Sequence, residues 1–89
     1  MSIKVHINLL LRQYTNDRDI VEVNGNTVGE CLKDLEEQFP TLKLFNKDGE
    51  LLAQLGIFEL REGLLYPKKL DKPIRDGDEL SIIPMICGG

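Results

Sequence analysis

The sequence has few of the side chains on which most catalytic and binding sites depend. Of its 89 residues none is Trp, 2 are Tyr, 3 are Phe, 2 are Cys and 1 is His. So few aromatic rings leave little surface on which nucleic-acid bases could stack. Cys31, Cys87 and His6 do not have the number or the spacing of a zinc site, so we expect no metal ion. The sequence also lacks a Gly-rich phosphate-binding motif and a recognisable nucleophile–base pair, which argues against an enzyme in its own right.

Positive charge is also scarce. The chain has 11 Lys and Arg against 15 Asp and Glu, a formal net charge of -4. Nucleic acids and anionic membranes attract basic proteins, so we expect neither as a partner. No apolar run approaches the ~20 residues that span a bilayer, and residues 1–12 lack the apolar core of a signal peptide. We therefore expect a cytoplasmic protein, in which a disulfide between the two cysteines is not expected.

The first part of the chain predicts two strands and a helix. Apolar residues alternate with polar ones over residues 3–11 and again over 19–23, and the short polar link predicts a hairpin. Thr27 and Glu30 have the spacing of a capping box, in which the hydroxyl accepts from the N–H of Glu30 and the carboxylate accepts from that of Thr27. Residues 28–39 then carry apolar side chains at helical spacing, and the following proline ends the helix.

The second part predicts mainly strands. Residues 41–54 are mixed, with a turn at 46–49 and a short helical turn at 42–45. The predicted strands cover residues 56–61, 64–66 and 79–85, with tight turns at 62–63 and 76–78.

This order of elements predicts an α+β fold. One main helix would cover one face of a mixed sheet of four to five strands, with the first and last strands parallel at its centre. That arrangement is the β-grasp, whereas the ferredoxin-like alternative needs a second strong helix. We expect residues 1–85 to form this domain and residues 86–89 to form a flexible tail that ends in Gly-Gly.

The end of the chain closely resembles that of the ubiquitin-like sulfur carriers. It runs from Asp76-Gly77-Asp78 through an aliphatic strand to Pro84, then Met85-Ile86-Cys87-Gly88-Gly89. This family includes the small subunit of molybdopterin synthase and the carriers of the thiamine and cysteine pathways. Residues 7–12, 25–30 and 70–74 also look like the family, so the resemblance covers nearly the whole chain. The length and the opening residues look closer to the molybdopterin and cysteine carriers than to the thiamine carriers.

The resemblance implies a role for the two terminal glycines. In such carriers a partner enzyme of the ubiquitin-activating type, an adenylyltransferase, uses ATP to adenylate the terminal carboxylate, here that of Gly89. Sulfur then displaces AMP to give a thiocarboxylate, which a sulfur-accepting synthase subunit consumes. The carrier itself binds no cofactor. Gly88 and Gly89 have no Cβ, so they suit a tail that enters narrow channels in its partners.

Some polar and thiol side chains have simpler explanations. Cys87 stands where the family often has Ala or Ser; it is either a tolerated small residue or a reactive thiol beside the acyl group. Cys31 lies on the apolar face of the predicted helix and is expected to be buried. His6 is expected at the surface, and the acidic run at 34–37 is expected to face solvent.

A partner-binding surface is predicted on the side of the sheet away from the helix. If the strands extend as predicted, Leu10, Ile83 and Met85 point to that side and form an exposed apolar patch. The alternatives are that the register of the strands differs from the predicted one or that residues 43–54 cover these side chains.

Three functions remain open from the sequence. The chain is a sulfur carrier, a ubiquitin-like modifier joined to lysines through Gly89, or a β-grasp module that binds without using its terminus. The sequence does not identify the acceptor of the sulfur.

Overall fold

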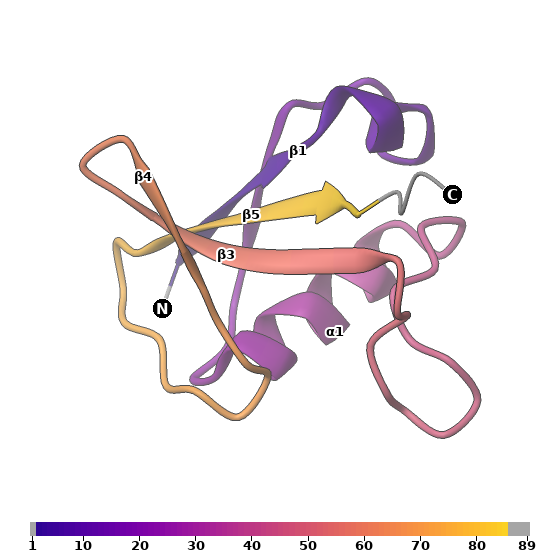
Figure 1. Cartoon of the computed structure of the whole chain (residues 1–89). Helices are drawn as coiled ribbons and strands as arrows, with labels where there is room; N and C mark the ends of the chain where they lie inside the picture. The colour runs from indigo at the N-terminus through magenta and orange to yellow at the C-terminus, as the bar shows by residue number, and fades with distance from the viewer. Residues whose placement is uncertain (1, 86–89) are drawn as a thin grey trace.

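The computed structural model describes residues 2–85 and forms one five-stranded sheet with one α-helix (Figure 1). In chain order the elements are β1 (Ile3–Ile7), the 3-10 helix η1 (Leu9–Tyr14), β2 (Ile20–Val23), α1 (Val28–Gln38), β3 (Leu55–Arg61), β4 (Leu64–Pro67) and β5 (Glu79–Pro84). The strand order is β2-β1-β5-β3-β4; β1 and β5 are parallel and the other pairs are antiparallel. The predicted α+β β-grasp fold is confirmed, and the helix needed for a ferredoxin-like fold is absent from residues 2–85.

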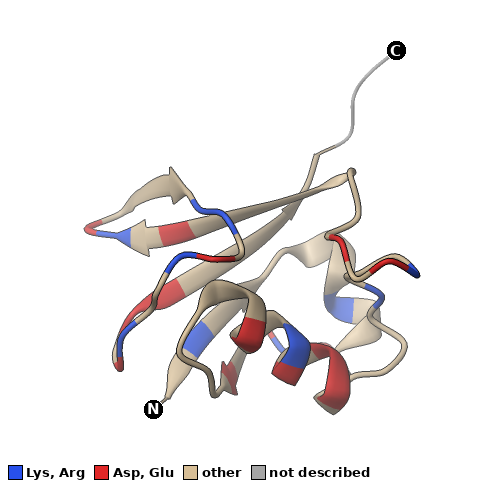
Figure 2. Ribbon diagram, turned by 90° about the horizontal axis from the view of Figure 1, so that it is seen from below, with Lys and Arg blue, Asp and Glu red and all other residues tan. Residues whose placement is uncertain are grey.

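The core lies between α1 and one face of the sheet. Side chains alternate along each strand, so Val5, Leu80 and Ile82 point to α1 and are fully buried. The helix contributes Val28, Cys31, Leu32 and Leu35 to the same core. Full burial of such an aliphatic side chain contributes roughly 1.5–3 kcal/mol. Figure 2 shows α1 on one side of the sheet, with the other side left open. No helix among residues 2–85 has both the length and the apolar character needed to cross a membrane.

The start of α1 is capped much as the sequence predicts, with one difference. The Thr27 hydroxyl accepts from the backbone N–H of Glu30 at 3.2 Å. The Glu30 carboxylate accepts from the N–H of Asn26 at 2.8 Å, one residue before the expected Thr27. The cap therefore also fixes the turn between β2 and α1 that leads into the helix.

Replacing Thr27 by Ala is expected to lower the free energy of unfolding by about 1 kcal/mol, because the N–H of Glu30 loses its acceptor. Urea denaturation of the wild-type protein and of T27A measures this loss. T27S keeps the hydroxyl and is the matched control. If T27S were as unstable as T27A, the methyl group of Thr27 rather than the cap would be responsible.

The first strand is shorter than predicted. It ends at Ile7, and residues 9–14 form η1 instead of continuing the sheet. The reason is local: the Asn8 side chain accepts from the N–H of Leu10 at 3.0 Å and caps the 3-10 helix. As a result Leu9, which the alternation places in the core, is 72% exposed.

The segment between α1 and β3 has no helical turn at 42–45, so that prediction is wrong. Leu42 and Leu44 are buried, and the Glu36 carboxylate accepts from the N–H groups of Leu44 and Phe45 at 2.8 and 3.3 Å. This interaction holds the segment extended against the end of α1. The turn at 46–49 is confirmed, because the N–H of Gly49 donates to the carbonyl oxygen of Asn46 and the Asn46 side chain accepts from the N–H groups of Asp48 and Glu50.

The acidic run on α1 is therefore more than a solvated face. Besides the contacts of Glu36, the Asp34 carboxylate accepts from the N–H of Asn24 at 2.9 Å and so ties α1 to the end of β2. Glu37 is exposed, as predicted. In Figure 2 acidic and basic positions are red and blue along the ribbon.

Candidate functional site: the end of β5 and the open face of the sheet

The main chain leaves the sheet close to Met85. Pro84, the last residue of β5, pairs with Leu55, and the N–H of Met85 donates to the carbonyl oxygen of Gln54 at 2.5 Å. Pairing with the segment before β3 thus continues one residue beyond β5. Residues 86–89, with Cys87, Gly88 and Gly89, lie outside the described residues, so their predicted roles and the predicted boundary at 85/86 stay predictions.

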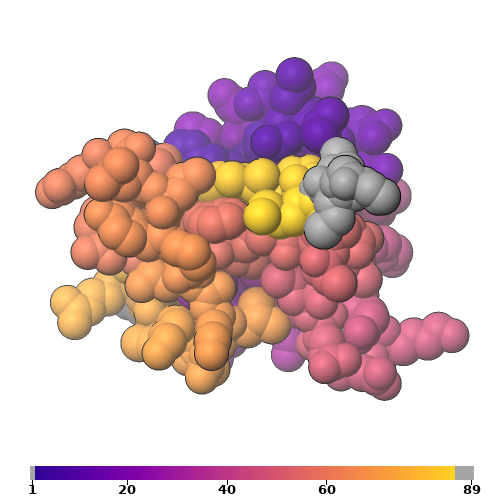
Figure 3. All heavy atoms as spheres, in the orientation of Figure 1, coloured from indigo at the N-terminus to yellow at the C-terminus, as the bar shows by residue number. Residues whose placement is uncertain are grey.

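An apolar patch covers part of the open face of the sheet, the face away from α1. Residues of β3, β4 and β5 that alternate with the buried positions point to this face. The patch comprises Phe58, Leu60, Leu65, Ile83 and Met85, and we call it the open-face patch. Leu65 and Met85 are 45% and 47% exposed. Figure 3 shows part of β5 at the surface, as a yellow strip between β1 and β3.

Gly56 allows this patch to form over β3. A Cβ atom at this position would lie 2.8 Å from the Phe58 ring and 3.0 Å from Cγ of Met85. The absent side chain therefore leaves the space in which Phe58 and Met85 approach one another. Because the two side chains meet there, the patch is continuous from β3 to the end of β5.

The structure places two of the three predicted patch residues together and separates the third. Ile83 and Met85 are on the open face, and Met85 is not covered by residues 43–54. Leu10 is 58% exposed but lies in η1 rather than on a strand, so its predicted place on the sheet face is wrong. Phe58, Leu60 and Leu65 were not predicted for this surface, although the alternation along residues 56–61 indicates the first two.

A polar strip lies beside the open-face patch. His6 of β1 lies beside Ser81 of β5, and Ser81 in turn lies beside Phe58 of β3. The His6 Nε2 atom is 2.5 Å from Oε1 of Glu79, and the histidine side chain is 30% exposed. His6 thus points away from the core, as predicted, and is half-buried and paired with a carboxylate. The contact with Glu79 fixes the orientation of the imidazole, so the open face carries a polar group beside its apolar area.

Cys31 has the environment of a core residue. It is fully buried on α1. Burial raises the pKa of its thiol to about 11, and the nearby carboxylates of Asp34 and Glu30 add to this effect. The thiol therefore stays protonated at neutral pH and is a poor nucleophile, which confirms the prediction of a buried apolar role.

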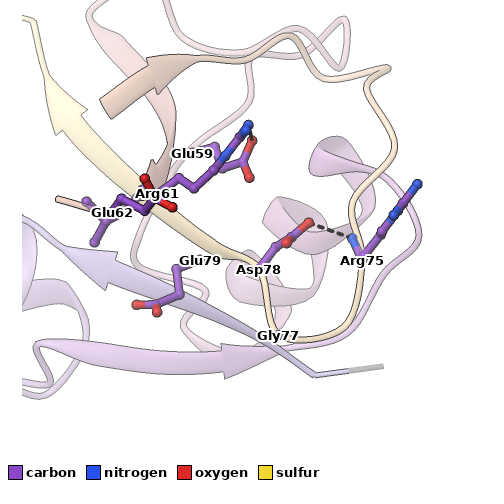
Figure 4. A pocket seen from close by; sticks show the side chains of 8 residues that line it. Glu59, Arg61, Glu62, Arg75, Gly77, Asp78 and Glu79 are labelled. Atoms are coloured by element: carbon purple, nitrogen blue, oxygen red, sulfur yellow. Dashed lines mark hydrogen bonds and ion pairs between the residues drawn. The ribbon is translucent and has the colours of Figure 1, made fainter. Parts of the chain in front are cut away.

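A charged cavity of about 560 Å³ lies at the amino end of β5, away from the end of the strand where the chain leaves the sheet. Figure 4 shows Arg61, Arg75, Asp78 and Glu79 around it. The Glu59 side chain is only 11% exposed, and its Oε1 atom lies 3.0 Å from both the Arg61 guanidinium and the Lys68 ammonium. These ion pairs join β3 to the segment after β4, so we interpret the cluster as structural.

Glu59→Gln is expected to destabilise the protein by about 1–2 kcal/mol at pH 7, because two cations lose their counter-ion. Burial opposes ionisation of Glu59, but hydrogen bonds from Arg61 and Lys68 outweigh it and lower its pKa below 4.5. The ionised group thus stabilises the fold above pH 4.5, and this contribution is lost as the pH falls through the lowered pKa. Urea denaturation against pH should show wild type and E59Q converging in acid. E62Q, on an exposed neighbour, is the control and should follow wild type throughout.

An apolar groove of about 290 Å³ lies at the other end of β5. Four segments that are far apart in the sequence form it, and its apolar lining includes Leu11, Tyr14, Leu42, Leu52, Leu55 and Pro84. The groove and the open-face patch therefore flank the point where the chain leaves the sheet, one on each side of β5.

Comparison with known proteins identifies the family. The model of the ThiS family matches residues 5–89. A predicted sulfur carrier protein of Archaeoglobus fulgidus is 32% identical, with all of both chains aligned. The crystal structure of SAMP1, a small archaeal modifier protein from Haloferax volcanii, superposes with a TM-score of 0.84, 26% identity and full coverage of both chains.

A second structure adds a complex to this comparison. A chain of the Amycolatopsis orientalis BexX/CysO complex is 29% identical, with a TM-score of 0.79 and coverage of 98% of this chain and 99% of that one. The family match extends to the end of the chain and includes the two terminal glycines. The chain therefore belongs to the ThiS family of β-grasp sulfur carriers, which are carriers rather than enzymes.

Proposed function

We propose that the chain carries sulfur as a thiocarboxylate on Gly89. A partner adenylyltransferase of the ubiquitin-activating type would use ATP to convert the carboxylate of Gly89 into an acyl-adenylate. A sulfur donor would then displace AMP, with the new C–S bond replacing the bond to the phosphate oxygen. A synthase partner would consume the sulfur and regenerate the carboxylate.

The observation that carries this proposal is the match of the family through residue 89 on a fold whose last strand ends beside an exposed apolar patch. Among residues 2–85 no three His, Cys, Asp or Glu side chains gather to hold a metal ion. Chemistry at Gly89 would accordingly depend on groups that the partners supply. The location that we propose for these reactions is the cytoplasm, where thiols stay reduced.

The open-face patch is the surface that we propose for partner docking. The solved BexX/CysO complex pairs a similar chain with a second protein, and apolar surface of this kind commonly marks an interface. Side chains at the centre of such a surface contribute most of the binding energy. Docking through Phe58, Ile83 and Met85 would place the chain end, which begins at the next residue, directly beside the partner.

Mass spectrometry of the intact protein tests the proposal. The chain would be incubated with ATP, a sulfide source and an activating enzyme encoded in the same genome, and the mass recorded before and after. We expect the increase that corresponds to exchange of one oxygen for sulfur, and a further increase by the mass of the added alkyl group when an alkylating reagent traps the thiocarboxylate. A mass unchanged with every activating enzyme of the genome would overturn the proposal.

A second function is favoured by the similarity to SAMP1, whose name is that of a modifier protein. A modifier shares the adenylation step, but the acyl group passes to a lysine amine instead of to sulfur. Peptides that carry a Gly-Gly remnant on lysine, found in extracts of the host only when the wild-type chain is present, would support this alternative.

A further inference from the structure

The two outer edges of the sheet differ in what covers them. β2 and β4 are the outer strands, so each has one side whose backbone groups pair with no neighbouring strand. At β2 the Gln38 side chain of α1 donates to the carbonyl oxygen of Glu22 at 2.9 Å. The Asp34 carboxylate accepts from the N–H of Asn24, directly after the strand. Side chains of α1 therefore cover the β2 edge.

The β4 edge has no such cover among residues 2–85. The N–H of Lys68 donates to the carbonyl oxygen of Ile57, which fixes the alternation of the pairing, so residues 64, 66 and 68 face β3 with their backbone groups. The backbone groups of Leu65 and Pro67 therefore point away from β3, and no side chain of the described residues bonds to them. Proline, which has no N–H to donate, is tolerated at such an outward position.

β4 also exposes apolar side chains on both of its faces. Leu64, Leu65 and Tyr66 are 59%, 45% and 40% exposed. Leu65 lies on the open face, and the other two alternate with it. The Arg61 guanidinium lies 5.0 Å from the centre of the Tyr66 ring and favours one orientation of this ring. Figure 3 shows this hairpin at the surface in orange tones. An uncovered edge strand of this kind is a site at which a further strand can pair.

We propose that the β4 strands of two copies of this chain pair antiparallel about a two-fold axis at Leu65. In this register Leu65 of each copy exchanges both backbone hydrogen bonds with Leu65 of the other, so the outward groups are satisfied. Leu64 lies directly opposite Tyr66 of the other copy, and aromatic–aliphatic pairs of this kind stabilise antiparallel strands. The two sheets join into one continuous sheet.

The charges beside β4 favour a second copy of the chain as the occupant of this edge. The same register brings Glu62, at the hairpin turn, to the level of Lys68 of the other copy, and the two-fold axis repeats this pairing of opposite charges. The Lys68 ammonium is held at that level by its 3.0 Å contact with Glu59 and has two further donors.

Pairing of β4 with the β2 edge of another copy is disfavoured. It would build an open chain of molecules rather than a closed pair, and Gln38 and Asp34 already bond to that edge. The two β4 strands have only four residues each. They bury less surface than a permanent dimer needs, so we expect reversible association with a dissociation constant of roughly 0.1–1 mM.

Sedimentation equilibrium of the full-length chain tests this pairing without any partner enzyme, so its result is independent of the chemistry proposed at Gly89. We expect the average mass to rise from that of the monomer towards that of the dimer as the concentration passes through roughly 0.1–1 mM. NMR shift changes with concentration should be confined to residues 62–68. In a mixture of labelled and unlabelled chains, isotope-filtered nuclear Overhauser effects should join the Leu64 methyl groups of one copy to the Tyr66 ring of the other.

Two substitutions at Leu65 test the register. Leu65→Lys places like charges directly opposite one another and should raise the dissociation constant about tenfold or more. Leu65→Pro removes the outward N–H but none of the bonds between β4 and β3, and it should have an effect of similar size. Ile20→Lys is the matched control, because Ile20 is 41% exposed on the covered edge strand. Met85→Asp is a second control, on the open-face patch but away from β4; both controls should dimerise as the wild type does.

NMR spectra of the dilute variants should match that of the wild type away from each substitution, which separates loss of pairing from loss of the fold. A chain that stays monomeric up to several millimolar would overturn the proposal, and so would a dimer that L65K and L65P leave intact. Equal weakening in I20K or M85D would place the contact on β2 or on the open face and contradict β4 pairing. A mass that grows beyond that of the dimer would indicate open-ended assembly instead of a two-fold pair.

Discussion

A chain that lacks Gly89 is expected to form no thiocarboxylate, while its fold and stability stay those of the wild type. The activating enzyme must place the terminal carboxylate against the α-phosphate of ATP, and a carboxylate one residue short falls roughly 3.5 Å away from that position. A displacement of this size removes the alignment on which the reaction depends. The mass of the intact protein after incubation with enzyme, ATP and sulfide gives the readout.

A chain extended by one alanine after Gly89 provides the matching control. It keeps both glycines but moves the carboxylate outwards, and it should also fail to react. Thermal denaturation should give the same midpoint for all three chains, since the core formed by residues 2–85 does not include the residue removed or added. If the shortened chain still exchanged an oxygen for sulfur, the position of the carboxylate would not be decisive, and the new terminal carboxylate of Gly88 would be the group modified.

The elements that the sequence predicts well are those that follow from local periodicity. The helix at 28–38 has a capping residue, an apolar stripe and a proline just beyond its end, and all three act within a few residues. The order of elements then restricts the topology, because a helix between two hairpins leaves few ways to bury one face of a sheet. The parallel pairing of β1 with β5 follows from that restriction.

The two wrong predictions of local structure have physical causes that the spacing of apolar residues does not reflect. Alternation continues past Ile7, but the side chain of Asn8 offers the backbone a local hydrogen bond, so a 3-10 helix replaces the strand. At residues 42–45 the Glu36 carboxylate, which is distant along the chain, determines the extended conformation. Both cases depend on single hydrogen bonds that compete with regular structure.

The candidate site was only partly predictable for a related reason. Ile83 and Met85 could be assigned to the open face because they alternate with the core residues of the last strand. Leu65 joins them only through the register of β4 on β3, where it pairs with Leu60. Four separate segments form the groove, so no continuous stretch of the sequence could have predicted it.

Met85→Asp is expected to weaken binding to a cognate partner, either the activating enzyme or the synthase subunit, by about 30-fold or more. This corresponds to about 2 kcal/mol, the cost of desolvating a charge in an apolar interface. Met85 is already 47% exposed, so the free energy of unfolding should change by no more than about 0.5 kcal/mol. Isothermal titration calorimetry measures the binding, and urea denaturation measures the stability.

Leu9→Asp and Leu65→Asp separate the docking surface from the chain end. Leu9 is 72% exposed in η1, outside the open-face patch, so L9D should bind as the wild type does. Leu65 is on β4, across β3 from the strand that carries Met85, yet it belongs to the same patch. If the patch is the docking surface, L65D should weaken binding as M85D does, although it leaves the neighbourhood of the terminal glycines unchanged. Loss of binding in M85D alone would instead show that the partner recognises the chain end and not the face of the sheet.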